Sequence, residues 1–363
     1  MPAAELYIGL MSGTSLDGID AALVDFSGPQ PSCIATAYQP YPDDLRRELL
    51  ALHRSSTDEL HHAALLANRL AHLYEQAVER VLANAGGPAV LAIGCHGQTV
   101  RHMPGDGYTL QLNNPALLAE LSGLTVVADF RSRDIAAGGQ GAPLVPAFHD
   151  AAFRTPDRHR TIVNIGGIAN ISDLRPGAPV RGLDCGPGNM LMDAWAQRHL
   201  GRPYDANGEW ASQGHVLPDL LQQLLAHEFF ALPPPKSCGR EQFNLDWLMK
   251  KVGASDTAID VQATLTELTA RGIADAVSAW CGRPDELWLC GGGAHNACLV
   301  RALRNHLGEV PIAKTDSLGL PADWVEAVAF AWLARQTMRG EPGNLPEVTG
   351  ARGRRVLGAI YPA

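Results

Sequence analysis

The stretch LYIGLMSGTSLDGIDAALVDF, at residues 6–26, decides the fold. Its two ends, residues 6–10 and 19–26, are apolar runs with the composition of β-strands. The segment between them consists mainly of small, hydroxyl and acidic residues. A strand, such a turn and a second strand together predict a β-hairpin.

The turn of this hairpin is suited to binding an anion. Gly13 and Gly18 let the backbone approach a ligand closely, because neither carries a side chain. Asp17 and Asp20 are carboxylates that could hold a divalent cation through water. We therefore expect phosphate oxygens and Mg²⁺ to bind here. The alternative is a hairpin whose glycines and serines serve only the turn.

A second glycine turn lies in the other half of the chain. Gly166 and Gly167 separate two further apolar runs, at residues 161–165 and 168–172. Two hairpins of the same kind indicate two halves of similar architecture, with a ligand held from both sides.

A third glycine segment completes a predicted nucleotide site. Gly291, Gly292 and Gly293 follow the apolar run 287–290 and precede a predicted helix at 297–307. A glycine loop between a strand and a helix N-terminus suits phosphate or a flat base. These glycines do not fit G-x-G-x-x-G, and no Gly-Lys-Ser/Thr occurs, so neither a dinucleotide fold nor a P-loop is indicated.

The composition is that of a cytoplasmic enzyme. The 363 residues are 46% hydrophobic, which is enough for two packed domains. The net charge of −9 and the scarcity of lysine argue against a nucleic-acid partner. The seven cysteines lack C-x-x-C spacing, which argues against a zinc site and structural disulfides. No signal-peptide pattern or bilayer-spanning run is evident, so we expect no membrane partner.

Helical and strand patterns alternate along the chain. Apolar periodicity predicts helices at residues 57–85, 258–280 and 321–338, and apolar runs predict strands at 90–95 and 125–128. Such alternation is typical of α/β layers. The segment 354–360 is expected to dock back on the first domain.

Asp184 is the strongest candidate for a catalytic residue. It follows a short apolar run and precedes Gly-Pro-Gly, so we predict it at the end of a strand. Ligands of open α/β sheets bind beyond the carboxyl ends of strands, which favours catalysis. The alternative is a helix-capping residue, but the next helix is expected to begin only near Asn189.

Taken together, these segments resemble the anhydro-N-acetylmuramic acid kinases of the sugar kinase/Hsp70/actin superfamily. The resemblance spans nearly the whole chain, and its motifs are Met11–Asp20, Cys95–Thr99, Asp129–Arg131, Asn164–Asn170, Leu183–Asn189, Lys236–Glu241 and Cys290–Asn296. It implies an α/β fold of two actin-like (ribonuclease H-like) domains around a central nucleotide cleft. Domain I is expected at residues 1–135 plus about 343–363, and domain II at 136–342.

The resemblance also implies a reaction. ATP with Mg²⁺ would phosphorylate 1,6-anhydro-N-acetylmuramic acid at O6 while the anhydro ring is opened by hydrolysis. The products would be N-acetylmuramic acid 6-phosphate and ADP, in the recycling of cell-wall murein. Members of the family are often dimers, so we expect a homodimer.

Residue roles follow from the same resemblance. Asp184 matches the general base that activates the attacking water. Gly166 and Gly167 match the facing phosphate turn, and Gly291, Gly292 and Gly293 are expected to approach the adenosine. The first ATP phosphate loop is matched by Gly13, Thr14, Ser15, Leu16, Asp17, Gly18, Ile19 and Asp20.

The lactyl carboxylate of the sugar needs a cation, and a guanidinium is its best partner. Arg131, after a predicted strand end, is the first candidate and Arg133 the second. An internal ion pair with Asp129 or Asp134 is the alternative for either arginine.

Two further residues are candidates for contacts with the sugar. Glu326 is a lone carboxylate near the start of an apolar helix, and it could bind the sugar or a water near the anhydro bridge. A solvated acid that suits the helix dipole is the alternative. His96, next to a glycine, could hydrogen-bond the sugar, or it could be a core histidine.

Two rival functions stay open on the sequence. One is another sugar kinase or an acetate kinase of the same fold. The other is an actin-like or chaperone-like ATPase, which would be expected to carry a polymerisation surface or a peptide-binding domain.

Overall fold

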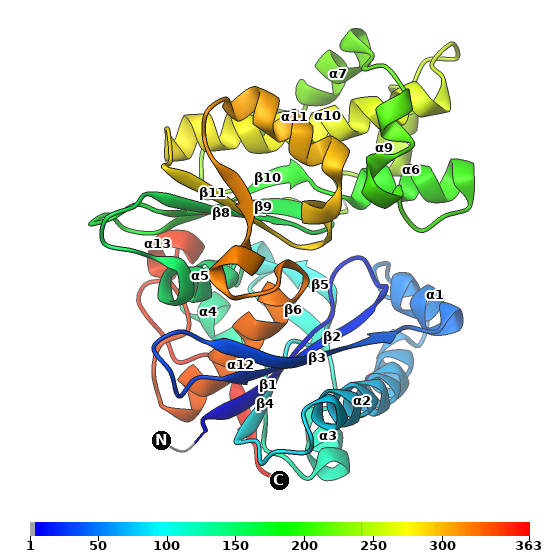
Figure 1. The fold of residues 1–363 in the computed structure, drawn as a ribbon. Helices are drawn as coiled ribbons and strands as arrows, with labels where there is room; N and C mark the ends of the chain where they lie inside the picture. Colours follow the sequence, from blue (N-terminus) through cyan, green and yellow to red (C-terminus); the bar gives the residue numbers. More distant parts are fainter. Residues whose placement is uncertain (1–3, 241) are drawn as a thin grey trace. The chain divides into compact units, whose positions relative to one another are not determined.

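The computed structural model describes residues 4–240 and 242–363. The chain divides into two compact units (Figure 1). Unit 1 comprises Met1–Ala152 with Gly319–Ala363, and unit 2 comprises Phe153–Leu318. Among the described residues, no helix combines the length and apolarity that crossing a bilayer requires.

Unit 1 is built on a mixed sheet in the order β13-β7-β4-β1-β2-β3. The predicted hairpin is present, because β1 and β2 pair antiparallel with Leu10 opposite Ala21. β4 and β7 add to the other side of β1 in parallel, and β13 closes that edge antiparallel. The strands are β1 (Leu6–Met11), β2 (Gly18–Asp25), β3 (Ser32–Pro40), β4 (Ala92–Cys95), β7 (Val126–Ala128) and β13 (Ala359–Tyr361).

Helices cover both faces of this sheet. Ile8 and Leu10 belong to the buried core that α2 (Glu59–Asn84) completes, and the alternation along β1 turns Gly9 to the opposite face. There α12 (Val325–Met338) packs on β1 and β4. The other elements of unit 1 are α1 (Asp43–Ala51), β5 (Gln98–Met103), η1 (Pro104–Asp106), β6 (Tyr108–Leu112), α3 (Pro115–Ser122), α4 (Ser132–Ala136), α5 (Val145–Phe153), which ends one residue into unit 2, η7 (Ala322–Trp324) and α13 (Pro346–Thr349).

A pair of glycines lets α12 approach the sheet closely. Gly9 and Gly94 lie opposite each other on the neighbouring strands β1 and β4. A Cβ atom on Gly9 would lie 1.8 Å from the carbonyl oxygen of Ala327, and one on Gly94 would lie 2.1 Å from that of Phe330. We call this glycine pair the α12 notch. It fixes the first turn of α12, and with it Glu326, against unit 1.

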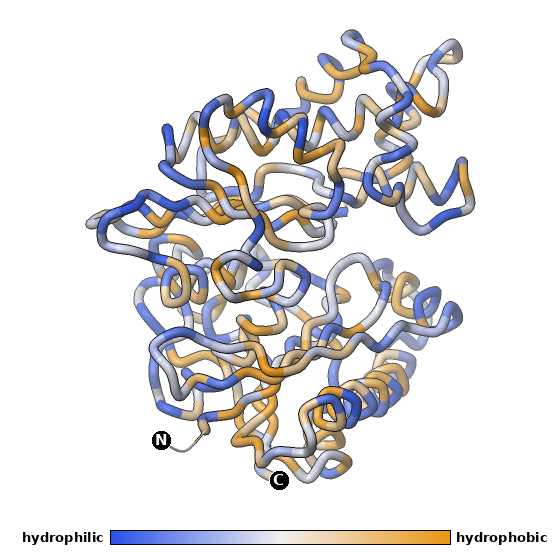
Figure 2. The backbone as a smooth tube through the Cα atoms, viewed as in Figure 1, coloured by the Kyte–Doolittle hydropathy of each residue, from blue (hydrophilic) through white to orange (hydrophobic). Residues whose placement is uncertain are grey.

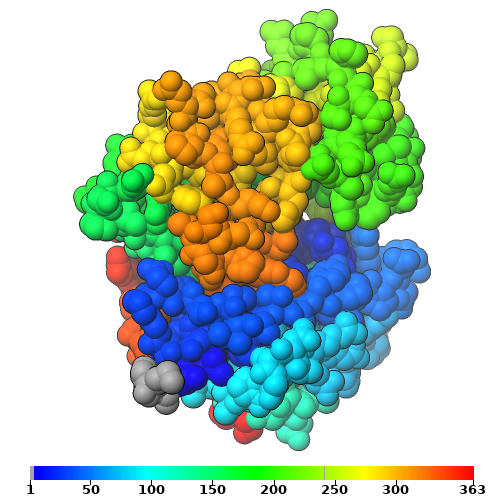
Figure 3. Space-filling model, viewed as in Figure 1, coloured from blue at the N-terminus to red at the C-terminus, as the bar shows by residue number. Residues whose placement is uncertain are grey.

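Hydropathy follows this layering. In Figure 2 the tube is largely orange along the central strands and α12 of unit 1, whereas α2 alternates between orange and blue. α2 is amphipathic, with buried residues that recur at helical spacing from Leu66 to Val81. In Figure 3 the visible surface of unit 1 is formed mostly by the blue N-terminal segment and the lighter blue to cyan segment that follows it.

Unit 2 repeats the sheet topology of unit 1. Its order is β10-β9-β8-β11-β12, with β8, β9 and β10 antiparallel and β11 and β12 parallel to β8. The strands are β8 (Arg160–Ile165), β9 (Ile168–Leu174), β10 (Arg181–Pro187), β11 (Glu286–Cys290) and β12 (Ile312–Lys314). The same connectivity in both units confirms the predicted α/β fold of two actin-like halves.

The main helix of unit 2 is α10 (Ala258–Ala276), which continues into a π-helical turn, η4 (Val277–Cys281). It packs against α11 (Ala297–Leu307) and the strand β10. The shorter elements are α6 (Met190–Leu200), η2 (Ala206–Gly208), η3 (Ala211–Gln213), α7 (Pro218–Leu225), α8 (Glu228–Ala231), α9 (Leu245–Met249), η5 (Gly292–His295) and η6 (Thr315–Leu318).

The structure differs from the sequence-based expectation at the domain boundaries. Residues 136–152 and 319–342 were expected in domain II, but they belong to unit 1. For residues 319–342 the physical reason is the α12 notch, which binds α12 to β1 and β4. The segment at 354–360 does dock on the first unit, since Ala359 and Ile360 of β13 pair with β7.

Candidate active site

The first glycine turn joins β1 to β2 in unit 1. It is closed by a hydrogen bond from the Leu16 amide to the Gly13 carbonyl, at 3.3 Å. Leu16 adopts a positive φ of 59° and is buried, so its side chain anchors the turn. Ser15 Oγ donates to Asp17 Oδ1 at 2.5 Å, and Tyr38 donates to the Asp17 carbonyl at 2.9 Å.

Side chains from the β4–β5 connection hold the carbonyl groups of this turn. The amide of Gln98 donates to the Gly13 carbonyl at 3.0 Å, and Nδ1 of His96 lies 3.3 Å from the Ser12 carbonyl. Ser12 Oγ donates to the Gly97 carbonyl at 3.0 Å and lies 2.7 Å from the hydroxyl of Tyr74. The turn is therefore fixed from one side.

The glycine positions fall into two groups. A Cβ atom on Gly13 would meet only Ser15, at 3.5 Å, and one on Gly166 would meet only Ile168, at 3.6 Å. Gly292 has similar space, with Asn189 at 3.8 Å. Each of the three turns thus contains a glycine that packing does not require, which favours close approach of a ligand.

Three other glycines of these turns are required for packing or backbone conformation. A Cβ atom on Gly18 would lie 2.5 Å from the carbonyl oxygen of Gln39, and one on Gly293 would lie 2.2 Å from Ile165. Gly291 has a positive φ of 77°. These three positions therefore shape the backbone, and their glycines carry no signal for a ligand.

An acidic group forms where β2 meets the start of α12. Burial, followed by the nearby charges of Asp17, Glu326 and Asp323 in that order, raises the pKa of Asp20 to about 8. Glu326 lies in the first turn of α12, and Asp323 lies in η7 just before it. We call Asp17, Asp20, Asp323 and Glu326 the acid group. The sequence predicted Asp17, Asp20 and Glu326 as site residues, but it gave no role to Asp323.

The acid group fits the donor chemistry of Mg²⁺. This ion prefers carboxylate oxygens and usually takes one or two of them together with phosphate oxygens and water. Asp17 and Asp20 beside a turn suited to phosphate meet that description. Among the described residues, no set of three or more acidic, histidine or cysteine side chains forms a protein-only metal cage.

Arg131 lies just after β7, as the N-cap residue of α4. Its Nε and Nη2 atoms donate to Nε2 of His96, at 3.1 and 2.9 Å, and its Nη1 donates to the Gly141 carbonyl at 2.8 Å. Arg133 is exposed on α4. These bonds fix the plane of the Arg131 guanidinium.

The acids that were considered as internal partners of these arginines have other hydrogen bonds. Asp134 is fully buried and accepts from the Gly141 amide, from Asn344 and from Thr349. Asp129 accepts from Ser132 at 2.5 Å. Asp134 therefore has a structural role that the sequence did not reveal, because Asn344 and Thr349 lie far along the chain.

The second glycine turn, in unit 2, is held by backbone groups. The amides of Gly188 and Met190 donate to the Gly167 carbonyl at 2.9 and 3.2 Å, and the Asn189 amide donates to the Gly166 carbonyl at 2.8 Å. Asn189 also donates through Nδ2 to the carbonyl of Ile165, at 3.1 Å. The carbonyls of this turn are thus held much as those of the first turn are, but mostly by main-chain amides.

Asp184 lies within β10 rather than at a strand end, which corrects the sequence-based placement. It pairs with Asn170 of β9, and the pairing register shifts between Asp184 and Gly186. Gly186 has a φ of 127°, and the irregularity it creates interrupts the strand directly after the carboxylate. Pairing with β9 makes this segment a strand, and such a long-range contact is not visible in the local sequence.

The segment Lys236–Cys238 holds Asp184 along its length, and we call it the strap. The Cys238 amide donates to Asp184 Oδ2 at 3.0 Å, and the Asp184 amide donates to the Lys236 carbonyl at 3.3 Å. Lys236 Nζ donates to the Phe229 carbonyl at 3.1 Å and lies over the Phe229 ring. Burial lowers the pKa of Lys236, and the nearby cysteines and Asp184 oppose that shift. The strap therefore orients one carboxylate oxygen.

The strap belongs to a motif that the sequence identified without assigning it a function. Its last member, Glu241, lies outside the described residues. Gln98 and Asn189 were also given no role. Both stand beside glycines within motif segments, which is the signal that could have pointed to them.

The third glycine segment follows β11 and leads into α11. Gly292 and Gly293 begin the short helix η5, and Asn296 caps α11 by accepting from the Leu299 amide at 3.0 Å. The segment thus joins a strand end to a helix N-terminus, as the sequence predicted.

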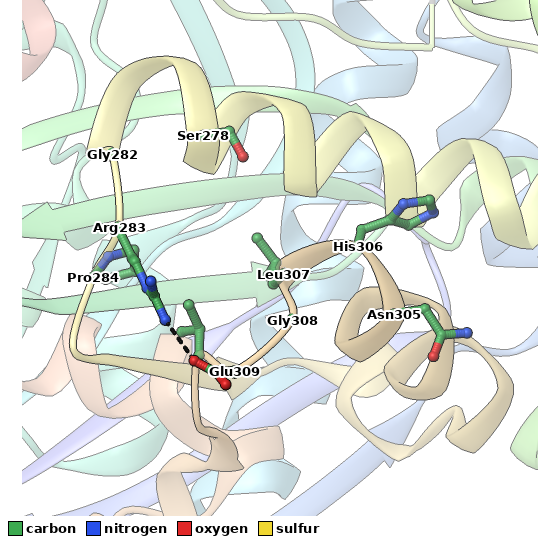
Figure 4. Close-up of a pocket in the computed structure, with 10 residues that line it drawn as sticks. Ser278, Gly282, Arg283, Pro284, Asn305, His306, Leu307, Gly308 and Glu309 are labelled. Carbon is green, nitrogen blue, oxygen red and sulfur yellow. Dashed lines mark hydrogen bonds and ion pairs between the residues drawn. The ribbon is translucent and has the colours of Figure 1, made fainter.

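A surface pocket of unit 2 lies at the other end of β11 (Figure 4). Gly282, Arg283 and Pro284 line it before β11, and Val310 lines it before β12. Arg283 and Glu309 form an ion pair there at 3.0 Å, and both side chains are exposed. Ligands of α/β sheets bind at the carboxyl ends of strands, so this pocket is no candidate for the nucleotide.

Comparison with known proteins identifies the family. The family model described as anhydro-N-acetylmuramic acid kinase matches residues 5–363. A protein of that name from Thiobacillus denitrificans is 58% identical over 99% of this chain and 98% of its own length. Another from Nitrosomonas europaea is 58% identical over 98% of this chain and 99% of its own.

Solved structures resemble the chain more distantly. Component A of the Acidaminococcus fermentans (R)-2-hydroxyglutaryl-CoA dehydratase is 13% identical with a TM-score of 0.48, over 90% of this chain and 96% of its own. A Streptomyces griseus ROK-family glucokinase in complex with glucose and AMPPNP is 16% identical with a TM-score of 0.41, over 91% of this chain and 99% of its own. On the full-length match to the family and its relatives, the chain belongs to the anhydro-N-acetylmuramic acid kinase family, whose members are phosphotransferases.

Proposed function

We propose that this chain uses ATP to phosphorylate 1,6-anhydro-N-acetylmuramic acid at O6 and opens the anhydro ring by hydrolysis in the same event. The products are N-acetylmuramic acid 6-phosphate and ADP, which places the reaction in murein recycling. The observation that carries this proposal is the family match, which spans residues 5–363 and includes all three glycine turns. Another sugar kinase or an acetate kinase is the competing function.

The reaction needs two coupled bond changes, because O6 is tied up in an acetal. A water oxygen forms a bond to C1 while the bond from C1 to O6 breaks. O6 then takes the γ-phosphoryl group, and ADP leaves. The attacking water must lose a proton, and a carboxylate held within reach can accept it. We propose Asp184 for this role, since the strap fixes one of its oxygens by a hydrogen bond of 3.0 Å.

The remaining roles are assigned by charge and space. Phosphoryl transfer depends mostly on positioning and charge neutralisation. We propose that the turn from Gly13 to Asp20 and the turn at Gly166 and Gly167 bind the phosphates, because Gly13 and Gly166 leave open space above the backbone. Gly291 to Gly293 would approach the adenosine.

For the lactyl carboxylate we propose Arg131 in preference to Arg133. The guanidinium of Arg131 is held by His96 and the Gly141 carbonyl, so little rotamer entropy is lost when an anion binds. Arg133 is exposed and would have to be ordered. Glu326, in the acid group, is proposed to contact the sugar or the water near the anhydro bridge.

We further propose that the chain binds Mg²⁺, acts in the cytoplasm and forms a homodimer. Asp17 and Asp20 would hold the ion, which neutralises phosphate charge when it is bound. The need for ATP favours the cytoplasm. A homodimer is expected from the family, and light scattering after size-exclusion chromatography measures it directly.

An acceptor panel tests the substrate. The purified chain is given ATP with anhydro-N-acetylmuramic acid, N-acetylmuramic acid, N-acetylglucosamine or acetate, and ADP release is followed. We expect turnover with the anhydro sugar. Turnover only with another acceptor would refute the assignment.

Isotope labelling tests the coupling. A single turnover in ¹⁸O water is analysed at once, because free reducing sugars exchange their anomeric oxygen slowly. Coupled chemistry puts the label on C1 and none in the ester bridge. Label in the bridge, or ring opening without ATP, would show a stepwise enzyme or a simple hydrolase.

A further inference from the structure

The ring of His96 connects the anion-binding arginine of unit 1 to its phosphate turn. It is almost fully buried, with 4% of its surface exposed. One ring nitrogen contacts Arg131 and the other lies 3.3 Å from the Ser12 carbonyl. Both nitrogens are therefore already used, which disfavours the expected direct hydrogen bond from His96 to the sugar.

The partners of the ring determine its protonation. A guanidinium can only donate, so Nε2 of His96 must be the acceptor for Arg131. A carbonyl can only accept, so Nδ1 must carry the hydrogen and donate it to Ser12. Burial and the charge of Arg131 hold the pKa of His96 well below its usual value, which keeps the ring neutral. The imidazole is thus a fixed Nδ1–H tautomer.

The surroundings of His96 restrain its orientation. The ring packs on Phe330 of α12, with centroids 4.7 Å apart, and the His96 amide donates to the Leu10 carbonyl at 3.0 Å. The nearby charged group that opposes protonation is Arg131. The ring is therefore held in one orientation between Arg131 and Ser12, with little freedom to move.

We propose that His96 is a positioning residue that orients both the arginine of the carboxylate subsite, Arg131, and the phosphate turn at Ser12 and Gly13. It touches neither substrate. It accepts hydrogen bonds from Arg131 at the carboxylate subsite and donates one to the Ser12 carbonyl at the phosphate turn. This inference rests on the proposed function for the identity of the carboxylate ligand. In unit 2 the Asn189 side chain donates to the Ile165 carbonyl of the equivalent turn and main-chain amides hold the carbonyls of Gly166 and Gly167, so the histidine that bridges the turn to an arginine belongs to unit 1.

Two substitutions separate the two hydrogen bonds. In His96→Asn the side-chain amide can replace Nδ1–H and keep the bond to Ser12, but it is too short to accept from Arg131. In His96→Gln the longer side chain places an oxygen near the position of Nε2, so it keeps the acceptor for Arg131 and loses the donor to Ser12. The same exchanges at His53, whose ring lies 3.1 Å from the Leu49 carbonyl just after α1, are the matched controls.

Each of the two variants should weaken the binding of a different ligand. His96→Asn should raise KM for the anhydro sugar about tenfold to a hundredfold, as loss of a hydrogen bond to a charged group does, and leave the Kd for ATP within about twofold. His96→Gln should raise the Kd for ATP about threefold to tenfold and keep KM for the sugar. Each His96 variant should keep a native circular-dichroism spectrum, and both His53 variants should match the wild type in thermal unfolding and in affinity for both ligands.

The experiment measures ATP binding by calorimetry without sugar, and KM for the sugar at saturating ATP. Equal effects of both substitutions on both ligands, or no effect of either, would overturn this double positioning role. If the wild type does not turn over the anhydro sugar, the proposed function fails, but the ATP titrations still decide the inference. Unchanged ATP affinity in His96→Gln would then refute it.

Discussion

Asp20 should make unit 1 less stable as the pH rises, and replacing it with asparagine should remove that dependence. The pKa of Asp20 in the folded chain is about 8, against 3.8 for an unperturbed carboxyl. Between these values the unfolded chain has lost the proton and the folded chain keeps it. The unfolded state therefore binds fewer protons, so stability falls with rising pH and levels off above the folded pKa.

The magnitude follows from the same linkage. One proton corresponds to about 1.4 kcal/mol per pH unit, so wild-type stability should fall by about 2 to 3 kcal/mol between pH 5 and pH 7 through Asp20 alone. Asp20→Asn cannot ionise, so it should not show this loss. The difference in unfolding free energy between the variant and the wild type should therefore grow by about 2 to 3 kcal/mol in favour of the variant from pH 5 to pH 7. The carboxyl is mostly buried, so solvent screening takes little from this value.

Asp25→Asn on the same strand is the matched control. The backbone amide of Ser27 lowers the pKa of Asp25, so this carboxyl is ionised in both states above pH 5. Its replacement should leave the pH dependence of stability unchanged.

The assay is pulse proteolysis in urea without Mg²⁺, with mass spectrometry of peptides from β1 and β2, because these report on unit 1 alone. A pH dependence of Asp20→Asn that runs parallel to that of the wild type would mean that Asp20 is ionised at neutral pH. The reasoning about the acid group would then be refuted.

Three further results are expected. Asp184→Asn keeps the shape of the side chain but cannot take a proton, so turnover should fall by at least about 10²–10⁴-fold with ATP affinity kept, and near-wild-type turnover would contradict the assignment. Gly13→Val should abolish ATP binding in calorimetry while circular dichroism stays native, because the new Cβ meets only Ser15 at 3.5 Å, whereas Gly18→Val should unfold the hairpin against Gln39. Binding of Mg²⁺ with ATP at pH 7 should release about one proton, because the ion favours the ionised form of Asp20. Calorimetry in two buffers of different ionisation heat measures this proton, and its persistence in Asp20→Asn would exclude Asp20 as its source.

The glycine hairpins could be predicted because their signals are local. Each consists of an apolar run, a glycine turn and another apolar run, and the strands β1, β2, β8 and β9 form where this pattern lies. The alternation of strands and helices likewise predicted α/β layers, but not the order of the strands within each sheet. The candidate residues Gly13 and Gly166 share a further property that only the structure reveals, namely the open space beside each.

The contacts that assemble the site are long-range and could not be predicted. Arg131 meets His96 because β7 and β4 are neighbours in the sheet, and nothing near either residue in the sequence specifies that pairing. Asp184 was expected at the end of a strand. Its strand instead continues past it, because β10 pairs with β9 as far as Pro187. The strap holds its carboxylate from a loop that returns much later in the chain.

The α12 notch explains how one such contact also shapes the proposed site. In the sequence, Gly9 and Gly94 look like ordinary breaks in apolar strands, and Gly13 looks no different from them. In the structure, Gly9 and Gly94 admit the backbone of α12, whereas Gly13 leaves space for a ligand. Because the notch holds the start of α12 against β1 and β4, Glu326 comes close enough to raise the pKa of Asp20. The acid group is therefore a consequence of packing between the first strands and the last long helix, and any change that fills the notch acts on the proposed metal site without touching it.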